Sequence, residues 1–361
     1  MNHAASVDMD VLAHGGPDDG PLITADFSTN AHPCGPNPFV LAAVREAHVE
    51  AYPDPSYRRL REALADLHGV ARERVVVGSS AGELIWRVTR LFANMASQRS
   101  GCVVVDAPTY GEYGRASRAS GLVIVPSAFV GSGATTLQWV CSPNNPTGEL
   151  LDAQIVRTLE DRADANWPPV VDLAYRPFQS LLEHGAVPHP GVLHAAWADR
   201  VVQLWSPNKL HGLTGVRGAY LVLPAQRNAM LNEHAFAAVA PSWVLGAYGV
   251  AMLHAHVLPQ AVTHLMSAQS ALQSWKASQD DALRRGGWTL RESALHFGLA
   301  RPPWPGEASQ PRPWHEHLRR HGIKLRDAAS FGLPEWVRLS VRPPKDVSRL
   351  IALTQDSMET G

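Results

Sequence analysis

Short apolar runs alternate with longer amphipathic segments through about the first two thirds of the chain. The runs are rich in Val, Leu and Ile, as buried strands are, and the segments between them repeat apolar residues at helical spacing. One helix is expected to open at Asn37 and Pro38, which precede Val40, Leu41 and Val44. Strands that alternate with helices predict a mainly parallel sheet covered by helices on both faces. We expect strands at residues 74–77, 102–106, 122–125, 137–141, 170–173, 201–204 and 219–223.

The pattern changes after about Ser242, where a long helical stretch begins. It is followed by an apolar segment at 294–299, a Pro- and Trp-rich loop at 301–313 and a helix near 314–321. Short strands are expected at 324–326 and 336–341, before a closing helix. A chain of 361 residues can form two cores. We therefore predict a large α/β/α domain over residues 40–245 and a smaller α+β domain built from 1–39 and 246–361.

Charge and hydropathy exclude several classes of protein. Lys and Arg number 32 and Asp and Glu 33, for a formal net charge of −1, which argues against an electrostatic nucleic-acid binder. No apolar run approaches the roughly 18 residues that a membrane span needs. The opening residues show no basic and apolar signal-peptide pattern. We expect a cytoplasmic protein with a small-molecule substrate and no nucleic-acid or membrane partner.

The cysteines and paired histidines predict no metal site. The cysteines form no C-x-x-C pair and are expected to be reduced: Cys34, Cys102 and Cys141. Two His-x-His pairs have no cysteine or carboxylate at matching ligand spacing: His254 with His256, and His315 with His317.

Three segments place a polar residue just after an apolar run. Asp172 ends one run, and a buried carboxylate must be paired or serve a ligand. Lys209 follows another, where partial desolvation would make its amine a nucleophile, and Arg217 lies eight residues later. Asn145 stands in the Pro-rich turn 141–148. Each feature alone has an ordinary alternative: a structural cap, a solvated lysine or a simple turn. Together they predict a site at the carboxyl ends of the strands.

In order and spacing, these segments resemble the class I/II aminotransferase family. The resemblance covers nearly the whole chain and rests on Asn145-Pro146-Thr147-Gly148, Asp172-x-x-Tyr175, and Ser206-x-x-Lys209 followed by Arg217. Members are fold type I enzymes that use pyridoxal 5′-phosphate. The resemblance implies that cofactor, a three-layer α/β/α large domain with a smaller α+β domain, and a homodimer.

The family also implies roles for the catalytic residues. Lys209 would hold the cofactor as a Schiff base and later move the α-proton of the substrate. Asp172 would accept a hydrogen bond from the protonated pyridine nitrogen, which keeps the ring electron-withdrawing. Asn145 and Tyr175 would bond the phenolate oxygen of the ring.

Further cofactor contacts follow from the same resemblance. The cofactor phosphate would lie at the start of a helix, where amides are free, held by Ser80, Ala81, Gly82, Ser206 and Arg217. Tyr110 would stack on the ring. Tyr52 would reach the phosphate of the cofactor in the second subunit. The chain departs from the family in three places: the Ser-Ala-Gly-Glu phosphate turn, Leu173 in place of an acidic residue, and His211, for which we prefer a surface position over a substrate contact.

Two branches of the family match best. Histidinol-phosphate aminotransferases share the segments 108–111 and 141–148. Threonine-phosphate decarboxylases of cobalamin biosynthesis share 14–16, 26–30, 112–116, 325–327 and 337–342. This balance favours the decarboxylase branch, with transamination of the histidinol-phosphate type as the alternative. The substrate contacts implied by the resemblance are His14, Asn30, Arg326, Arg338 and Arg342. Three arginines within 17 residues predict a phosphorylated amino acid as substrate.

A different class of function is a ligand-binding module of a transcription regulator. We expect no such role, because no helix-turn-helix or basic stretch precedes the fold and because a non-catalytic member would be expected to have lost Lys209.

Overall fold

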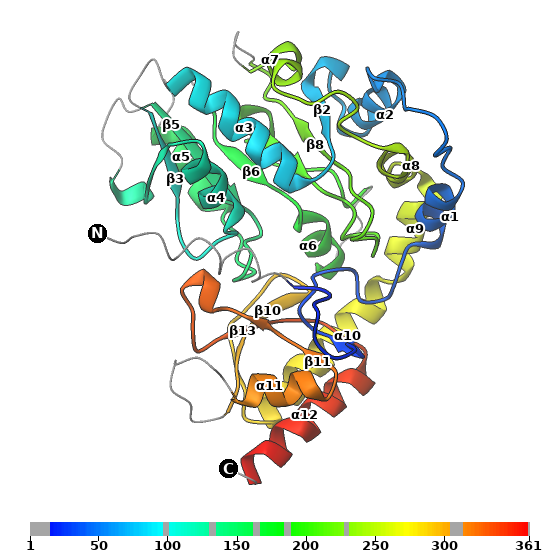
Figure 1. Ribbon diagram of the computed structural model, residues 1–361, viewed down its shortest axis with the longest axis vertical. Helices are drawn as coiled ribbons and strands as arrows, with labels where there is room; N and C mark the ends of the chain where they lie inside the picture. The colour runs from blue at the N-terminus through cyan, green and yellow to red at the C-terminus, as the bar shows by residue number, and fades with distance from the viewer. Residues whose placement is uncertain are drawn as a thin grey trace.

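The computed structural model describes residues 15–96, 101–129, 135–161, 167–183, 189–226, 231–303 and 313–359. Within them, a seven-stranded sheet has the strand order β2-β8-β7-β6-β5-β3-β4 (Figure 1). Its strands are β2 (Val75–Gly78), β3 (Gly101–Val105), β4 (Val123–Val125), β5 (Thr135–Cys141), β6 (Val170–Asp172), β7 (Val202–Trp205) and β8 (Ala219–Val222). All neighbours are parallel except β8, which is antiparallel to both β2 and β7. The predicted mainly parallel sheet is confirmed.

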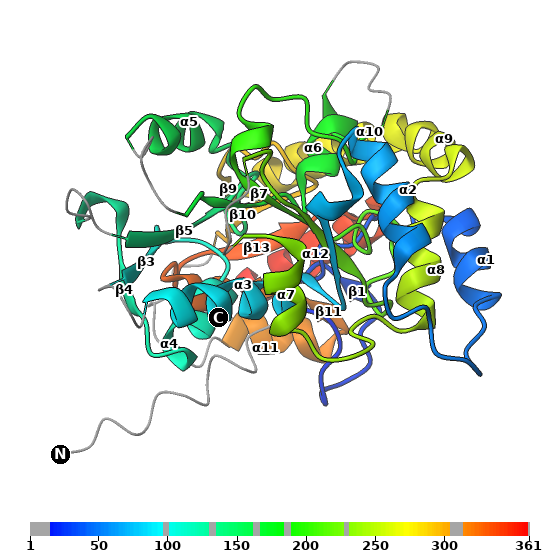
Figure 2. The ribbon, with the colours of Figure 1, turned by 90° about the horizontal axis from the view of Figure 1, so that it is seen from above.

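Alternate residues of each strand pack against opposite layers of helices. Val75 and Val77 belong to a core that includes residues of α1 (Pro38–Arg45), α2 (Arg58–His68), α5 (Asp152–Asp161) and α8 (Ala247–His256). Val76 faces the other way, into a core with α3 (Ala81–Ala96), α4 (Glu112–Ala119) and α7 (Glu233–Ala238). Figure 2 shows α3 and α7 on one side of the sheet and α2 and α5 on the other. The predicted three-layer arrangement is confirmed.

A smaller α+β unit lies below the large sheet in Figure 1. Its four-stranded antiparallel sheet has the order β12-β13-β10-β9, formed by β9 (Thr289–Leu290), β10 (Phe297–Arg301), β12 (Arg326–Asp327) and β13 (Val337–Ser340). Its helices are α10 (Gln269–Arg285), α11 (Pro313–Arg320) and α12 (Pro344–Glu359). Two further helices, α6 (Arg176–Leu182) and α9 (Pro259–Ser267), lie outside this sheet's own core.

The N-terminal arm packs with this smaller unit. Strand β1 (Ala25–Asp26) pairs in parallel with β11 (Ile323–Lys324), and Phe27 is fully buried in the same core. The amide of Phe27 donates to the carbonyl of Lys324, and its own carbonyl accepts from the amide of Ser340. The arm is therefore part of the smaller unit's core, while the predicted domain boundaries at 40 and 245 stay a prediction.

Helix α8 lies directly against the chain that carries Arg217. A Cβ at Gly249 would overlap the carbonyl oxygen of Arg217. We expect Gly249→Ala to lower the free energy of unfolding by about 2 kcal/mol, as overpacked cores do, even though alanine favours a helix. Gly246→Ala is the matched control, because its Cβ would meet no atom within 4 Å. Equal midpoints for the two variants in urea unfolding would contradict this packing.

Candidate active site

A cavity of about 920 Å³ lies between the large sheet and the smaller unit. Cys141, Asp172 and Ser206, at the carboxyl ends of β5, β6 and β7, form one wall, and Arg326 and Arg338 of the smaller unit contribute to the other. The cavity lies where open α/β sheets bind ligands. Of the predicted site residues, those that line it are Asn30, Ser80, Ala81, Gly82, Tyr110, Asn145, Asp172, Tyr175, Ser206, Lys209, Arg217, Arg326 and Arg338.

Asp172 is a buried carboxylate with 3% of its surface exposed. Its Oδ2 accepts a hydrogen bond from the Tyr113 hydroxyl at 2.7 Å, and its Oδ1 accepts one from the amide of Ala174 at 3.0 Å. Burial raises the pKa of Asp172, while these two donors and the charge of Lys209 act in the opposite direction. Among the described residues no basic side chain is hydrogen-bonded to this carboxylate. It can therefore receive a cationic N–H group from a ligand.

Tyr113 is a functional neighbour that sequence reasoning missed. It is fully buried on α4, and its ring stacks on Trp139 of β5 with centroids 4.9 Å apart and planes within 8°. Burial, followed by the charge of Asp172, raises the pKa of Tyr113 well above its usual value, so its hydroxyl stays a donor. The available signal was its position three residues after Tyr110, which lines the cavity.

Lys209 follows β7 and is partly exposed to the cavity. Its Nζ lies 5.5 Å from the ring centroid of Tyr175. Burial lowers the pKa of Lys209, the charge of Asp172 raises it, and the charge of Arg217 lowers it further. More of the amine is therefore neutral, which is the form that attacks a carbonyl carbon. The alternative of an ordinary solvated lysine does not fit this environment.

A hydrogen-bonded network orients the polar groups beside Lys209. The Nδ2 of Asn30 donates to the Tyr175 hydroxyl at 3.2 Å. The Nη1 of Arg338 donates to the Oδ1 of Asn145 at 2.6 Å, and its Nη2 donates to the Ser28 carbonyl at 2.7 Å. Because Arg338 occupies the oxygen of Asn145, the amide nitrogen of Asn145 is left as the donor for a ligand. Tyr175 and Asn145 thus present hydrogen-bond donors near the amine.

The turn before α3 offers donors for an anion. Ala81 is the first residue of this helix, and the first amides of an α-helix have no acceptor within it. The Oγ of Ser206 is buried and has no hydrogen-bond partner. Within the described residues, the guanidinium of Arg217 makes one long hydrogen bond, of 3.4 Å, to the Thr214 carbonyl. These unused donors around Ser80 and Gly82 fit a phosphate group.

The two predicted tyrosine contacts lie in different places. Tyr110 lines the cavity, with its ring edge-on to Tyr113 at 5.6 Å, and burial raises the pKa of Tyr110 to about 12. Tyr52 does not line it: this residue is 80% exposed and stacks on Trp243, with ring centroids 4.5 Å apart. Its predicted contact with the cofactor of a second subunit stays a prediction.

The five predicted substrate contacts do not all meet at the cavity. Arg326 and Arg338 line it and are buried, and burial, with repulsion from Arg338, lowers the pKa of Arg326 to about 10. Arg342 is not brought to the cavity, because its guanidinium forms an ion pair with Asp346 at 3.2 Å. The predicted substrate contact of Arg342 stays a prediction. His14 lies outside the described residues.

His211 is not at the surface, so the preferred interpretation from sequence was wrong. The side chain is fully buried, and its Nε2 is 2.9 Å from the Nδ1 of His256. Burial lowers the pKa of His211 to about 3, which keeps this ring neutral. It does not line the main cavity and has a packing role beneath the segment that carries Lys209.

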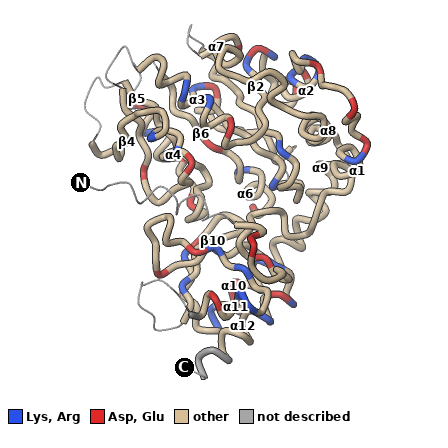
Figure 3. Tube along the Cα trace, in the orientation of Figure 1, with Lys and Arg blue, Asp and Glu red and all other residues tan. Residues whose placement is uncertain are grey.

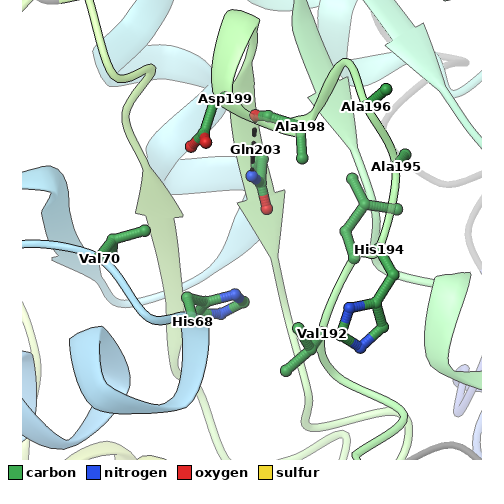
Figure 4. A pocket seen from close by; sticks show the side chains of 10 residues that line it. His68, Val70, Val192, His194, Ala195, Ala196, Ala198, Asp199 and Gln203 are labelled. Carbon is green, nitrogen blue, oxygen red and sulfur yellow. Dashed lines mark hydrogen bonds between the residues drawn. The ribbon is translucent and has the colours of Figure 1, made fainter.

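A second cavity, of about 320 Å³, lies near the start of β7 rather than at its end. Figure 4 shows His68, Asp199 and Gln203 around it. The Nε2 of Gln203 donates to the Ala198 carbonyl at 3.0 Å, and Arg74 pairs with Asp199 at 2.6 Å. These polar groups are already bonded within the protein, and we assign them no chemistry.

The fold and the cavity define an α/β enzyme with a lysine, an aspartate and an anion site at the strand ends. The family model for aminotransferase class I and II matches residues 24–352, and the chain belongs to this family. It is 27% identical to the histidinol-phosphate aminotransferase of Symbiobacterium thermophilum, over 93% of this chain and 91% of that protein. It is also 27% identical to the histidinol-phosphate aminotransferase of Leuconostoc mesenteroides, over 90% and 89%.

Solved structures show the same fold. The L-threonine-O-3-phosphate decarboxylase from Porphyromonas gingivalis superposes with a TM-score of 0.71 at 21% identity, covering 92% of this chain and 99% of that one. The histidinol-phosphate aminotransferase from Sinorhizobium meliloti, solved in complex with pyridoxal 5′-phosphate, gives 0.72 at 20% identity, covering 93% and 92%.

Pyridoxal 5′-phosphate is the cofactor of this family and of this enzyme. The cavity fits it in two independent ways. The buried carboxylate of Asp172 lacks a cationic partner, which the pyridine nitrogen would supply, and the buried Oγ of Ser206 lacks an acceptor, which the phosphate would supply. Lys209, which lines the same cavity, would be the amine that binds the aldehyde.

Tyr113→Phe isolates the hydrogen bond to Asp172 while keeping the stack on Trp139. The carboxylate must be ionised to hold the pyridine N–H group, so activity is lost as pH falls through the pKa of Asp172. Because the Tyr113 hydroxyl lowers this pKa, its removal should shift the acidic limb of the kcat/KM profile to higher pH. An unchanged acidic limb, with cofactor still bound, would contradict the role given to Tyr113.

Proposed function

We propose that this enzyme exchanges an amino group between histidinol phosphate and 2-oxoglutarate. The observation that carries the proposal is the pair of buried guanidiniums, Arg326 and Arg338, in the cavity beside Lys209. In the described residues neither is ion-paired to a carboxylate, so both can bind anionic groups of a ligand. Histidinol phosphate carries a phosphate, and 2-oxoglutarate carries two carboxylates. The names of the relatives favour this transamination over the decarboxylation that the sequence segments favoured.

Five polar residues of the cavity have a task in this reaction. Bound pyridoxal phosphate supplies an electron-withdrawing ring next to the carbon that bears the amino group. The neutral Nζ of Lys209 removes and returns a proton at that carbon. The carboxylate of Asp172 holds the ring N–H group, and the amide of Asn145 and the hydroxyl of Tyr175 bond its phenolate oxygen. Arg338, fixed by Asn145 and Ser28, orients the substrate.

Decarboxylation of threonine phosphate is the second candidate. It is supported by the segments shared with those enzymes, 26–30 and 112–116 among them, and by the similarity of fold to the Porphyromonas enzyme. The bond that stands perpendicular to the cofactor ring is the one that breaks, so the orientation of the substrate decides between loss of a proton and loss of CO2. A change of about 1.4 kcal/mol between the two orientations shifts their ratio tenfold.

The same family resemblance supports a homodimer. Tyr52 and Trp243, which are 80% and 44% exposed, stack on each other and form an aromatic patch that a second subunit would cover. Tyr52 would then reach the cofactor phosphate of that subunit. A cytoplasmic location also stays a prediction; no helix among the described residues is long and apolar enough to span a membrane.

The test is a product assay on the cofactor-loaded enzyme. It is incubated with histidinol phosphate plus 2-oxoglutarate, and separately with threonine phosphate. We expect glutamate in the first reaction and no aminopropanol phosphate or CO2 in the second. Lys209→Ala, the matched control, should form neither product. CO2 from threonine phosphate without glutamate from histidinol phosphate would establish the second candidate instead.

The variants Arg326→Ala and Arg342→Ala compare two arginines that the sequence predicts as substrate contacts. Arg326 lines the cavity, and a charge-assisted hydrogen bond is worth about 1.5–3 kcal/mol, so we expect its loss to lower kcat/KM for histidinol phosphate about tenfold or more. Arg342 is paired with Asp346, and its loss should change kcat/KM by less than about twofold. The reverse order in steady-state kinetics would contradict the geometry described here.

A further inference from the structure

The charged side chains of the main cavity are unevenly balanced. Six basic residues line it, against the two acidic residues Glu112 and Asp172: Arg115, Arg118, Lys209, Arg217, Arg326 and Arg338. The chain as a whole has a formal net charge of −1, and Figure 3 shows basic and acidic residues distributed over the whole fold. The excess of positive charge is therefore a property of the cavity. It indicates a ligand set with several negative charges.

Two of these cations, on α4, have no task in the proposed reaction. Arg115 is held by the protein, because its guanidinium lies 3.4 Å from the carboxylate of Glu112 and 5.9 Å from the ring centre of Trp86. The side chain of Arg118, one turn further along, makes no hydrogen bond or ion pair with any residue that the structure describes. Its guanidinium is exposed where α4 borders the cavity.

Gly114 provides the space into which Arg118 extends. A Cβ at residue 114 would lie 3.2 Å from the Nη1 of Arg118, so the guanidinium lies back over this glycine, which itself lines the cavity. Glycine inside a helix costs about 1 kcal/mol relative to alanine. Side chains on a helix point toward its N-terminus, which here is the end nearest Tyr110. Arg118 is thus directed along α4 toward the part of the cavity that Tyr110 lines.

We propose that Arg118 is a specificity-determining residue that binds the anionic group at the far end of the substrate from its amino-bearing carbon. The inference rests on the proposed function, because it assigns a residue to the phosphate of that substrate. Arg217 belongs to the cofactor phosphate, and Arg326 and Arg338 belong to the inner part of the cavity. Arg118 supplies the outer contact, and its planar fork can hold two oxygens of a phosphate monoester.

The test measures binding by calorimetry to the enzyme loaded with pyridoxamine 5′-phosphate, the amine form of the cofactor, which cannot take an amino group from an amine substrate; histidinol phosphate and histidinol are the two probes. We expect the wild type to bind the phosphate ester more tightly, and Arg118→Ala to weaken that binding about fivefold without changing the Kd of histidinol. The effect should shrink at high salt, because the contact is exposed. Arg118→Lys should restore part of it. Arg90→Ala, an exposed arginine of α3 that does not line the cavity, is the matched control and should change neither Kd.

Gly114→Ala tests the position of the guanidinium without removing its charge. It should reduce the preference for the phosphate ester while the melting temperature stays equal or rises, since alanine is the better helix former. An unchanged preference in Arg118→Ala, or no preference in the wild type, would overturn the inference. A preference that depends on Arg118 in an enzyme that forms no glutamate would leave the inference standing and refute the proposed reaction, so the two failures are distinguishable.

Discussion

The burial of Asp172 at the end of β6 is the constraint on which the site depends. A carboxylate in this position is costly unless donors surround it. The chain supplies two, the Tyr113 hydroxyl and the amide of Ala174, and the pyridine nitrogen of the cofactor would supply a third. The first of these depends on the position of α4, where the ring of Tyr113 stacks on Trp139 of β5. The same helix also carries Arg115 and Arg118, which line the cavity. The position of α4 that brings Tyr113 to Asp172 therefore also places these two arginines.

Much of the fold could be predicted because buried parallel strands form unbroken apolar runs. All seven strands of the large sheet lie within one or two residues of their predicted places, and Asn37 caps α1 as expected. The smaller unit was less predictable. Strands β1, β11 and β12 have two residues each, so their formation depends on pairing with distant chain, as between Ala25 and Ile323. The single strand predicted at 324–326 is instead divided between β11 and β12.

Site residues could be predicted where they lie close together in one sequence motif. They could not be predicted where two interacting residues are far apart in the sequence. Ser206, Lys209 and Arg217 follow one strand, so a short motif shared with the family predicts them, and all three line the cavity. Tyr113 is 59 residues from Asp172, so its hydrogen bond is visible only in the structure. Arg342, also predicted as a substrate contact, does not line the cavity and pairs with Asp346, four positions later.

The charge of the cavity connects recognition with stability. Arg326 and Arg338 belong to the smaller unit, whereas Arg217 and Lys209 belong to the large one, and burial lowers the pKa of Arg326 and of Arg338. Because these cations repel one another, their charges oppose close packing of the two units around the cavity. A ligand that brings negative charge relieves this repulsion and binds the folded chain alone, so it adds to the free energy of unfolding by mass action. The arginines and the lysine that bind anionic ligands therefore also allow those ligands to stabilise the contact between the two units.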